Sequence, residues 1–184
     1  MVFIDGVVIG LLLAKIRGGK WLRLTEATLR GVWLIVLAFV IQFGSIFLFP
    51  KFLLVAVQLS YFLLLVFVFL NRTKSGFVLM ALGIAFNLLV MMVNGGRMPV
   101  EVEAARSLDP ELLPALLAGQ YGKHIAMSSS THLNILGDFI YLRFPYPHPT
   151  IISIGDVFFS VGMIIFIQAM TLKKNAIDKG SVNC

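Results

Sequence analysis

Two aspartates that each follow a glycine are the residues of this sequence best suited to chemistry. Asp138 stands in Leu-Gly-Asp-Phe-Ile and Asp156 in Ser-Ile-Gly-Asp-Val, 18 positions apart. If two carboxyl groups meet at one water molecule they share a proton, so one has a raised pKa and acts as the acid while the other acts as the base. This is the chemistry of an aspartyl hydrolase, and we predict Asp138 and Asp156 as its catalytic residues. Their spacing permits this meeting but does not require it.

Asp156 lies inside an apolar stretch, about seven residues from its start and therefore roughly 10 Å from the end of a helix. An ionisable side chain at that depth in a membrane costs a few kcal/mol unless it is paired, protonated or hydrated. Ser153 and Ser160 share its helical face. Gly155 and Gly162 allow a second helix to approach closely. Asp156 therefore either carries function or caps a neighbouring backbone, and both interpretations stay open.

A turn with two consecutive glycines, Asn-Gly-Gly-Arg, ends another apolar run and is the second candidate feature. Paired glycines make a sharp turn that exposes backbone groups for hydrogen bonding. Arg97 in this turn carries five donors suited to a carboxylate or a phosphate. The alternative is an ordinary helix end with an interfacial arginine. The predicted substrate-binding set comprises Asn94, Gly95, Gly96, Arg97, His124 and His132.

The sequence predicts no metal site and no other cofactor. His124 and His132 are eight positions apart, which is weak evidence for shared metal ligation. Either histidine could instead pair with Asp138. The sequence contains no Gly-rich phosphate loop, no His-Glu-x-x-His and no Gly-x-Ser-x-Gly. Its single cysteine, Cys184, excludes an intrachain disulfide.

The composition places these candidates in a membrane protein. Hydrophobic residues make up 59% of the 184 residues and charged residues only 13%. The mean hydropathy is +0.94. A soluble domain of this size needs far more charge to cover its surface, so the composition excludes a disordered chain, a coiled coil and an ordinary soluble enzyme. The net charge of +6 comes from basic residues at the ends of apolar runs, which indicates anionic lipids rather than nucleic acid as partners.

Five apolar runs are long enough, or nearly so, to span a bilayer. They cover residues 1–14, 31–49, 52–70, 76–93 and 150–172. We therefore predict an all-α, polytopic membrane helix bundle that forms a single domain over residues 1–184. Residues 94–149 form the one large segment between spans, and Asp109-Pro110-Glu111 followed by leucines predicts a short amphipathic helix there that ends near Gly119.

Lysine and arginine set the predicted orientation. Ten of the basic residues fall on one side of the spans: Lys15, Arg17, Lys20, Arg23, Arg30, Arg72, Lys74, Lys173, Lys174 and Lys179. By the positive-inside rule this side is cytoplasmic, so the N-terminus lies outside and the C-terminus inside. Residues 94–149 then form an extracytoplasmic cap at the outer face of a bacterial plasma membrane, where Asp138 and Asp156 also lie.

The whole chain resembles a bacterial family of small multispanning proteins of unknown function. The resemblance rests on Gly-Gly within a basic segment at Arg17 to Lys20, Asn-Gly-Gly-x-Met-Pro from Asn94 to Pro99, Leu-Gly-Asp ending at Asp138, and Ser-Ile-Gly-Asp ending at Asp156. It covers nearly the full length and implies no established activity.

The last 40 residues resemble the end of lipoprotein signal peptidase, also called signal peptidase II. That family has one catalytic aspartate before its last span and one near the start of that span, as Asp138 and Asp156 stand here. The resemblance implies an aspartyl peptidase at the outer membrane face. The family's Asn-x-x-Asp-Arg motif is missing, however, and His132-Leu133-Asn134 stands near its place.

Two functional hypotheses from different classes follow. In the first, the protein is an intramembrane aspartyl-type hydrolase that acts on a lipid-linked or membrane-embedded peptide substrate. In the second, it is a non-enzymatic membrane protein, a small carrier, a lipid-binding protein or an assembly partner. Its aspartates would then bind a proton or cation, or hold the outer ends of the spans together. The relative placement of Asp138 and Asp156 distinguishes the two hypotheses.

Overall fold

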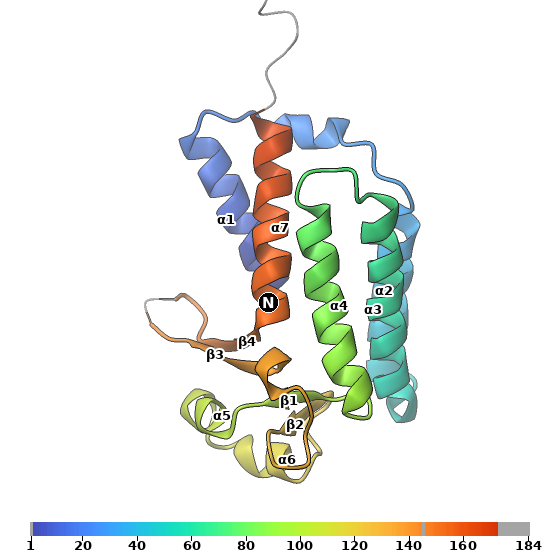
Figure 1. Ribbon diagram of the computed structural model, residues 1–184, viewed down its shortest axis with the longest axis vertical. Coiled ribbons are helices and arrows are strands. Elements are labelled where there is room, and N and C mark those ends of the chain that lie inside the picture. The colour runs from blue at the N-terminus through green and yellow to red at the C-terminus, as the bar shows by residue number, and fades with distance from the viewer. Residues whose placement is uncertain (1, 145, 173–184) are drawn as a thin grey trace, which may run out of the picture.

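The computed structural model describes residues 2–144 and 146–172. Lys173, Lys174, Lys179 and Cys184, which the topology and cysteine arguments used, lie outside these ranges. Five long helices lie side by side (Figure 1). They are α1 (Val2–Ile16), α2 (Val32–Phe47), α3 (Leu53–Leu70), α4 (Phe77–Val93) and α7 (Ile154–Thr171). Three short 3-10 helices cover Trp21–Glu26, Pro50–Phe52 and Asn134–Leu136.

The long helices coincide with the predicted apolar runs, but the number of membrane spans is not thereby established. Two stretches are long and apolar enough to cross a bilayer by length and composition, Pro50–Leu70 and Ile154–Thr171. Two shorter apolar helices, Val32–Phe47 and Phe77–Val93, accompany them. The chain is thus mostly helical with apolar helices of membrane character, and five spans stay a prediction.

The prediction of an all-α chain is wrong, because the segment between α4 and α7 contains a four-stranded sheet. Its strands are β1 (Met98–Val100), β2 (His124–Ala126), β3 (Asp138–Leu142) and β4 (Thr150–Ser153), in the order β2-β1-β3-β4. Strand β1 is parallel to β2 and β3, and β4 is antiparallel to β3. The sheet lies at one end of the helix bundle (Figure 1).

The start of the fifth predicted span is therefore displaced. Residues 150–153, which the apolar run includes, form β4 and pair with β3, and α7 begins only at Ile154. The β-branched run Thr-Ile-Ile after a proline suits a strand, while Ser153 supplies the cap acceptor at which a helix begins. Hydropathy alone cannot separate these two segments, because both are apolar.

Two short helices pack beside the sheet, α5 (Val102–Leu108) and α6 (Leu113–Leu117). The predicted amphipathic helix corresponds to α6, but α6 starts later than expected. The side chain of Asp109 accepts hydrogen bonds from the backbone N–H groups of Glu111 and Leu112, so it caps a turn that precedes the helix. Gly119 ends α6 with φ of +65°, as predicted.

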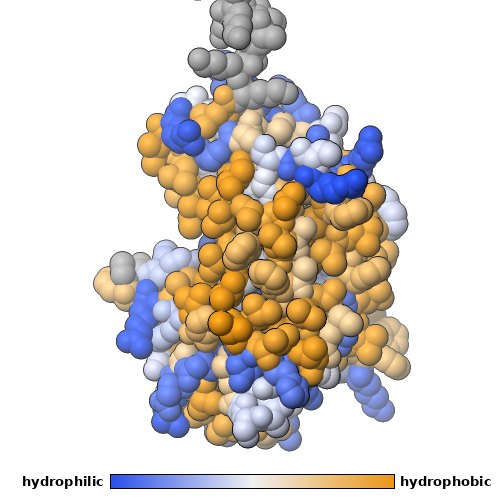
Figure 2. All heavy atoms as spheres, viewed as in Figure 1, coloured by the Kyte–Doolittle hydropathy of each residue, from blue (hydrophilic) through white to orange (hydrophobic). Residues whose placement is uncertain are grey.

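The surface of the bundle is apolar between two polar ends. Figure 2 shows a broad hydrophobic band over the helices, with hydrophilic residues gathered at both ends of the molecule. On α2 and α3 the large exposed side chains include Trp33, Phe47, Val55 and Phe62. Soluble monomers rarely expose a contiguous apolar surface of this extent, and such surfaces mark contact with a membrane or with a protein partner.

Helices α4 and α7 pack closely because glycines face each other across their contact. Gly83 of α4 lies against the backbone of Gly155 in α7, and Gly76, just before α4, lies against Gly162. A methyl group at any of these positions would collide with the opposite backbone or with a side chain that the contact has brought close. Gly76 and Gly83 are seven positions apart, as are Gly155 and Gly162, and seven positions are about two helical turns, so both contacts lie on the same side of α4 and α7.

Replacing Gly83 with Ala should therefore separate α4 from α7. We expect Gly83→Ala to lower the stability of the detergent-solubilised protein by roughly 1–3 kcal/mol, the usual cost of overpacking, and to lower the midpoint of thermal unfolding. The matched control is Gly44→Ala in α2, where nothing lies within 4 Å of an added methyl group. Equal unfolding midpoints for both variants would contradict this account of the helix contact.

Candidate functional site

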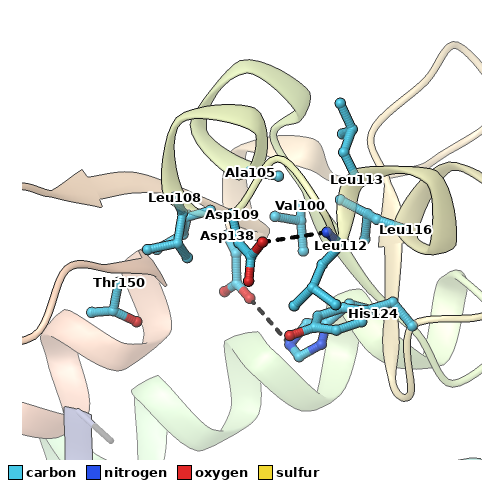
Figure 3. A pocket seen from close by; sticks show the side chains of 12 residues that line it. Val100, Ala105, Leu108, Asp109, Leu112, Leu113, Leu116, His124, Asp138 and Thr150 are labelled. Atoms are coloured by element: carbon cyan, nitrogen blue, oxygen red, sulfur yellow. Dashed lines mark hydrogen bonds and ion pairs between the residues drawn. The ribbon is translucent and has the colours of Figure 1, made fainter.

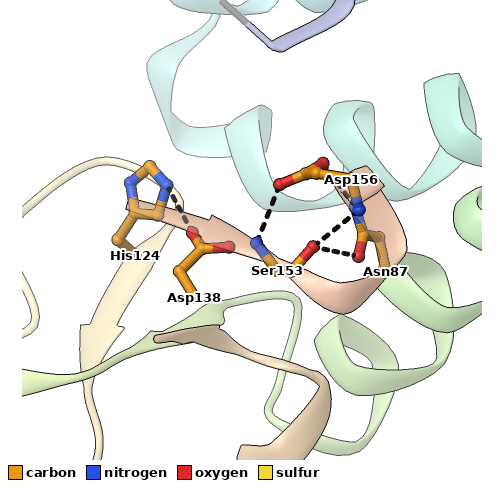
Figure 4. A network of polar contacts seen from close by, with 5 residues as sticks. All are labelled: Asn87, His124, Asp138, Ser153 and Asp156. Carbon is orange, nitrogen blue, oxygen red and sulfur yellow. Dashed lines mark hydrogen bonds and ion pairs between the residues drawn. The ribbon is translucent and has the colours of Figure 1, made fainter. Parts of the chain in front are cut away.

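A network of side chains from α4 and α7 surrounds Asp156 (Figure 4). The Ser153 hydroxyl accepts a hydrogen bond from the Asp156 N–H at 3.0 Å, and Asp156 Oδ2 accepts from the Ser153 N–H at 3.1 Å. These two bonds form a capping box that begins α7. Asn87 of α4 donates from Nδ2 to Asp156 Oδ1 at 2.9 Å, and its Oδ1 accepts from the Ser153 hydroxyl at 2.8 Å. In the structure Asp156 therefore caps the backbone N–H of Ser153, which is the kind of interaction that the backbone-capping interpretation describes.

Asp138 begins β3 and lies beside this network. It is opposite Ser153 in the register of β3 and β4, and only 8% of its surface is exposed. Its Oδ2 lies 3.7 Å from Nε2 of His124, which begins β2. The structure therefore brings His124 to Asp138. Asp138 and Asp156 lie on either side of Ser153 (Figure 4). No hydrogen bond links their carboxyl groups within residues 2–144 and 146–172.

Burial and a neighbouring charge change the protonation of this pair. Burial, together with the charge of Asp156, raises the pKa of Asp138 to about 8, although the charge of Lys123 opposes the rise. Burial, together with Lys123, lowers the pKa of His124 to about 4. At neutral pH Asp138 is therefore mostly protonated and His124 is neutral. Their contact is one between two uncharged groups and not a salt bridge.

Lys123 supplies a positive charge near Asp138 and Asp156. Its Nζ lies 5.6 Å from the centroid of the Tyr61 ring in α3. The interaction with Tyr61 raises the pKa of Lys123, burial lowers it, and the charges of Asp138 and Asp156 raise it further. The net result is a raised pKa, so Lys123 stays a cation. No local sequence pattern pointed to the place of Lys123 among residues of α3, β3 and α7.

Asn94 and His132 also meet, but through the backbone of His132. Asn94 follows α4 and donates from Nδ2 to the His132 carbonyl at 2.8 Å, while its Oδ1 accepts from the His132 N–H at 2.8 Å. Gly95 and Gly96 form the predicted turn with φ of +64° and +88°. Arg97 donates to the carbonyl of Gly119 at the end of α6.

These four turn residues therefore attach the segment 98–149 to the end of α4. Among the described residues, no recorded contact joins Arg97 to either aspartate. The predicted role of Asn94, Gly95, Gly96, Arg97, His124 and His132 in substrate binding stays a prediction.

Two cavities lie on opposite sides of the polar group formed by Asp138, Ser153 and Asp156. Asp138 lines the first cavity and Asp156 lines the second. The first, which we call the cap pocket, has a volume of about 190 Å³ and lies between the sheet and the helices α5 and α6. His124 and Asp138 are among its polar lining residues, together with Asp109, Tyr121 and Thr150. Val100, Leu108 and Leu116 are among its apolar ones (Figure 3).

The second, the bundle cavity, has a volume of about 280 Å³ and lies among α2, α3, α4 and α7. Its polar lining residues are Tyr61, Asn87 and Asp156, and the rest of its wall is almost entirely apolar. Within the described ranges no group of three His, Cys, Asp or Glu side chains could hold a metal ion.

Comparison with known proteins identifies relatives without an assigned activity. The model of a family of unknown function, DUF5317, matches residues 26–168. An uncharacterized protein of Thermotoga maritima is 32% identical over 163 residues, which cover 89% of this chain and 88% of the relative. No solved structure matches the chain. These matches agree with the resemblance to a family of unknown function and give no support to the resemblance to lipoprotein signal peptidase.

The raised pKa of Asp138 predicts a pH-dependent stability. Between the pKa of an unfolded aspartate, 3.8, and about 8 the folded protein holds a proton that the unfolded chain releases, so stability falls as pH rises, by at most about 1.4 kcal/mol per pH unit. The lowered pKa of His124 acts in the opposite direction, but only below its unfolded value of 6.5.

The pH range from 6.5 to 8 therefore isolates Asp138 from His124. We expect the midpoint of thermal unfolding to fall across this range in the wild type and to fall less in Asp138→Asn. Glu111→Gln, a substitution at an exposed residue, is the control and should behave as the wild type. An identical pH slope in all three proteins would show that Asp138 ionises normally.

Proposed function

The chain belongs to the DUF5317 family of unknown function, and because that family brings no activity, we propose one from the structure. The protein is a multi-pass membrane protein that binds one apolar chain of an amphiphilic molecule in the bundle cavity. The observation that carries this proposal is the form of the cavity, which is apolar along its length and polar at one end. The proposal develops the lipid-binding hypothesis of the sequence analysis.

The apolar band and the distribution of charge support a multi-pass arrangement. Helices of 16 to 18 residues rise about 24–27 Å, slightly less than a bilayer core of about 30 Å, and modest thinning of the bilayer accommodates that difference. The described basic residues from Lys15 to Arg30, with Arg72 and Lys74, lie in the last turn of α1 and in the connections at the end of the bundle away from the sheet. This end is cytoplasmic by the positive-inside rule, so the sheet and its helices face outward at a bacterial plasma membrane.

The size and lining of the bundle cavity suit a single hydrocarbon chain. Its walls include Phe39, Phe67, Phe159 and Phe166 with several aliphatic side chains. A dry apolar cavity of about 150 Å³ already holds a benzene molecule, and typical ligand sites begin near about 300 Å³. A volume of about 280 Å³ therefore accommodates part of an acyl or prenyl chain.

The polar end of the cavity has unused hydrogen-bonding capacity. Each oxygen of Asp156 accepts one hydrogen bond from the protein, and a carboxylate oxygen has room for a second. The amide of Asn87 uses one of its two N–H groups. The hydroxyl of Tyr61 lies near Lys123. This arrangement fits a head group with a hydroxyl or amine that donates to Asp156.

Blocking the cavity tests the proposal. Ile35 of α2 lines the cavity, whereas its neighbour Val36 is 59% exposed on the outside of the bundle. We expect Ile35→Trp to fill the cavity and to reduce the amount of co-purifying lipid, measured by native mass spectrometry in mild detergent, by roughly tenfold or more, the change that about 1.4 kcal/mol of lost contact produces.

Val36→Trp is the matched control, because it adds the same ring to the same helix outside the cavity. It should retain bound lipid at the level of the wild type. If both tryptophan variants and the wild type hold the same lipid in the same amount, the cavity is not the binding site. Release of the wild type from membranes by alkaline carbonate would contradict the multi-pass arrangement.

One observation favours a second function, acid–base chemistry on a molecule that reaches both Asp138 in the cap pocket and Asp156 in the bundle cavity. Asp138 is mostly protonated at neutral pH, which is the state that the aspartyl-hydrolase hypothesis requires of its acid. The cap pocket gives access to Asp138 from the outer side. Here Asp138 is the acid, Asp156 is the base, and the substrate is a lipid-linked or membrane peptide.

Lipid and peptide turnover in reconstituted vesicles tests this second function. If it holds, the wild type converts a component of a bacterial lipid extract or a membrane peptide, and Asp138→Asn and Asp156→Asn lose at least about a hundredfold in rate, as expected when an acid or base is removed. Equal turnover by the wild type and both variants, at equal folded amounts, would exclude catalysis by the pair.

A further inference from the structure

A basic groove lies at the end of the bundle opposite the sheet. It forms between the segment that precedes α2 and the connection from α3 to α4, and its volume is about 560 Å³. The residues that line it are Thr28, Leu29, Arg30, Leu70, Asn71, Arg72, Thr73 and Lys74. Three cations and two hydroxyl groups thus surround one depression.

A buried asparagine fixes the two arginines of the groove next to each other. Asn71, which is 2% exposed, accepts the Arg30 N–H at Oδ1 (2.9 Å) and donates from Nδ2 to the Arg30 carbonyl (2.8 Å). It also donates to the carbonyl of Phe67 in α3. Because Arg72 follows Asn71 directly, this clamp sets the distance between the Arg30 and Arg72 backbones. The groove is therefore a built feature and not a chance meeting of flexible loops.

Within residues 2–144 and 146–172, the cations of the groove have no acidic partner. No ion pair joins Arg30, Arg72 or Lys74 to a carboxylate there, and the ion pair of Arg106 with Glu103 lies in the segment between α4 and α7. Arg72 packs its guanidinium 4.4 Å from the centroid of the Phe69 ring and donates one hydrogen bond to the Phe69 carbonyl. A guanidinium has five donors, so Arg72 keeps most of them for a ligand.

The positive-inside rule explains basic residues on this side, but it does not explain a groove. Lys15 and Lys20 lie on the same side and do not line it. The groove also adjoins the bundle cavity, because Leu29 lines both. The phosphate group of a ligand in the groove would therefore lie among the cations, and its apolar part would lie against the helices.

We propose that this basic groove binds the phosphate group of an anionic phospholipid in the cytoplasmic leaflet. Basic pockets between helices on the cytoplasmic side suit such head groups, and paired arginines match phosphate geometry. Arg30, Arg72 and Lys74 supply the charge, and Thr28 and Thr73 supply hydroxyl donors. The proposal rests on the membrane arrangement above but not on the ligand of the bundle cavity.

The experiment compares two double variants of the full-length protein in phosphatidylcholine nanodiscs that contain increasing fractions of phosphatidylglycerol. Arg30→Gln/Arg72→Gln removes two charges from the groove. Lys15→Gln/Lys20→Gln removes two charges from the same end outside it. Native mass spectrometry counts the phosphatidylglycerol that each protein retains. A basic residue that contacts the bound head group contributes on the order of fivefold in affinity, so we expect retention about 25-fold weaker in the groove variant. Lys15 and Lys20 do not line the groove, so the control should retain the lipid far closer to the level of the wild type.

Two outcomes would overturn the proposal. One is equal retention of phosphatidylglycerol by the two double variants. The other is full displacement of the lipid by inorganic phosphate or glycerol phosphate at equal concentration, which would identify a site for a soluble anion. Thermal unfolding of each variant verifies the fold, which the substitutions spare because Asn71 holds the backbone of Arg30. Carbonate extraction of the wild type tests the membrane arrangement separately.

Discussion

The close contact of α4 with α7 through facing glycines is the constraint on which the rest of the structure depends. Because Gly83 and Gly155 have no side chains, the two helices approach until Asn87 reaches the first turn of α7. That approach closes the network with Ser153 and Asp156, which separates the bundle cavity from the cap pocket. A wider helix spacing would leave the Asp156 carboxylate without Asn87 in an apolar bundle, at a cost of several kcal/mol.

The same structural device attaches a distant segment to each of two consecutive helices. Asn71 follows α3 and Asn94 follows α4, and each donates to the carbonyl four residues earlier. Each then binds both the N–H and the carbonyl of one distant residue, Arg30 and His132 respectively. One side chain thereby satisfies helix-end carbonyls that would otherwise lack partners and holds one connection at each end of the bundle.

Local sequence patterns predicted the helices and the family but not the tertiary partners. Hydropathy located five long helices because an apolar run of 14 to 23 residues is a strong local signal. The strands β1 and β2 have three residues each and pair with segments far along the chain, so they leave no local period. The unusual position of Asp156 was visible in the sequence, whereas its partner Asn87 and the nearby Lys123 depend on helix packing. Arg97 was predicted to bind substrate, and only the fold shows its contact with Gly119.

Strand β4 passes into α7 without an intervening loop, since β4 ends at Ser153 and α7 begins at Ile154. Thr150 and Ile151 of this continuous segment line the cap pocket, and Asp156 lines the bundle cavity. One short segment thus forms part of the wall of both cavities. The pairing of β4 with β3 and the capping box of α7 fix its position in each.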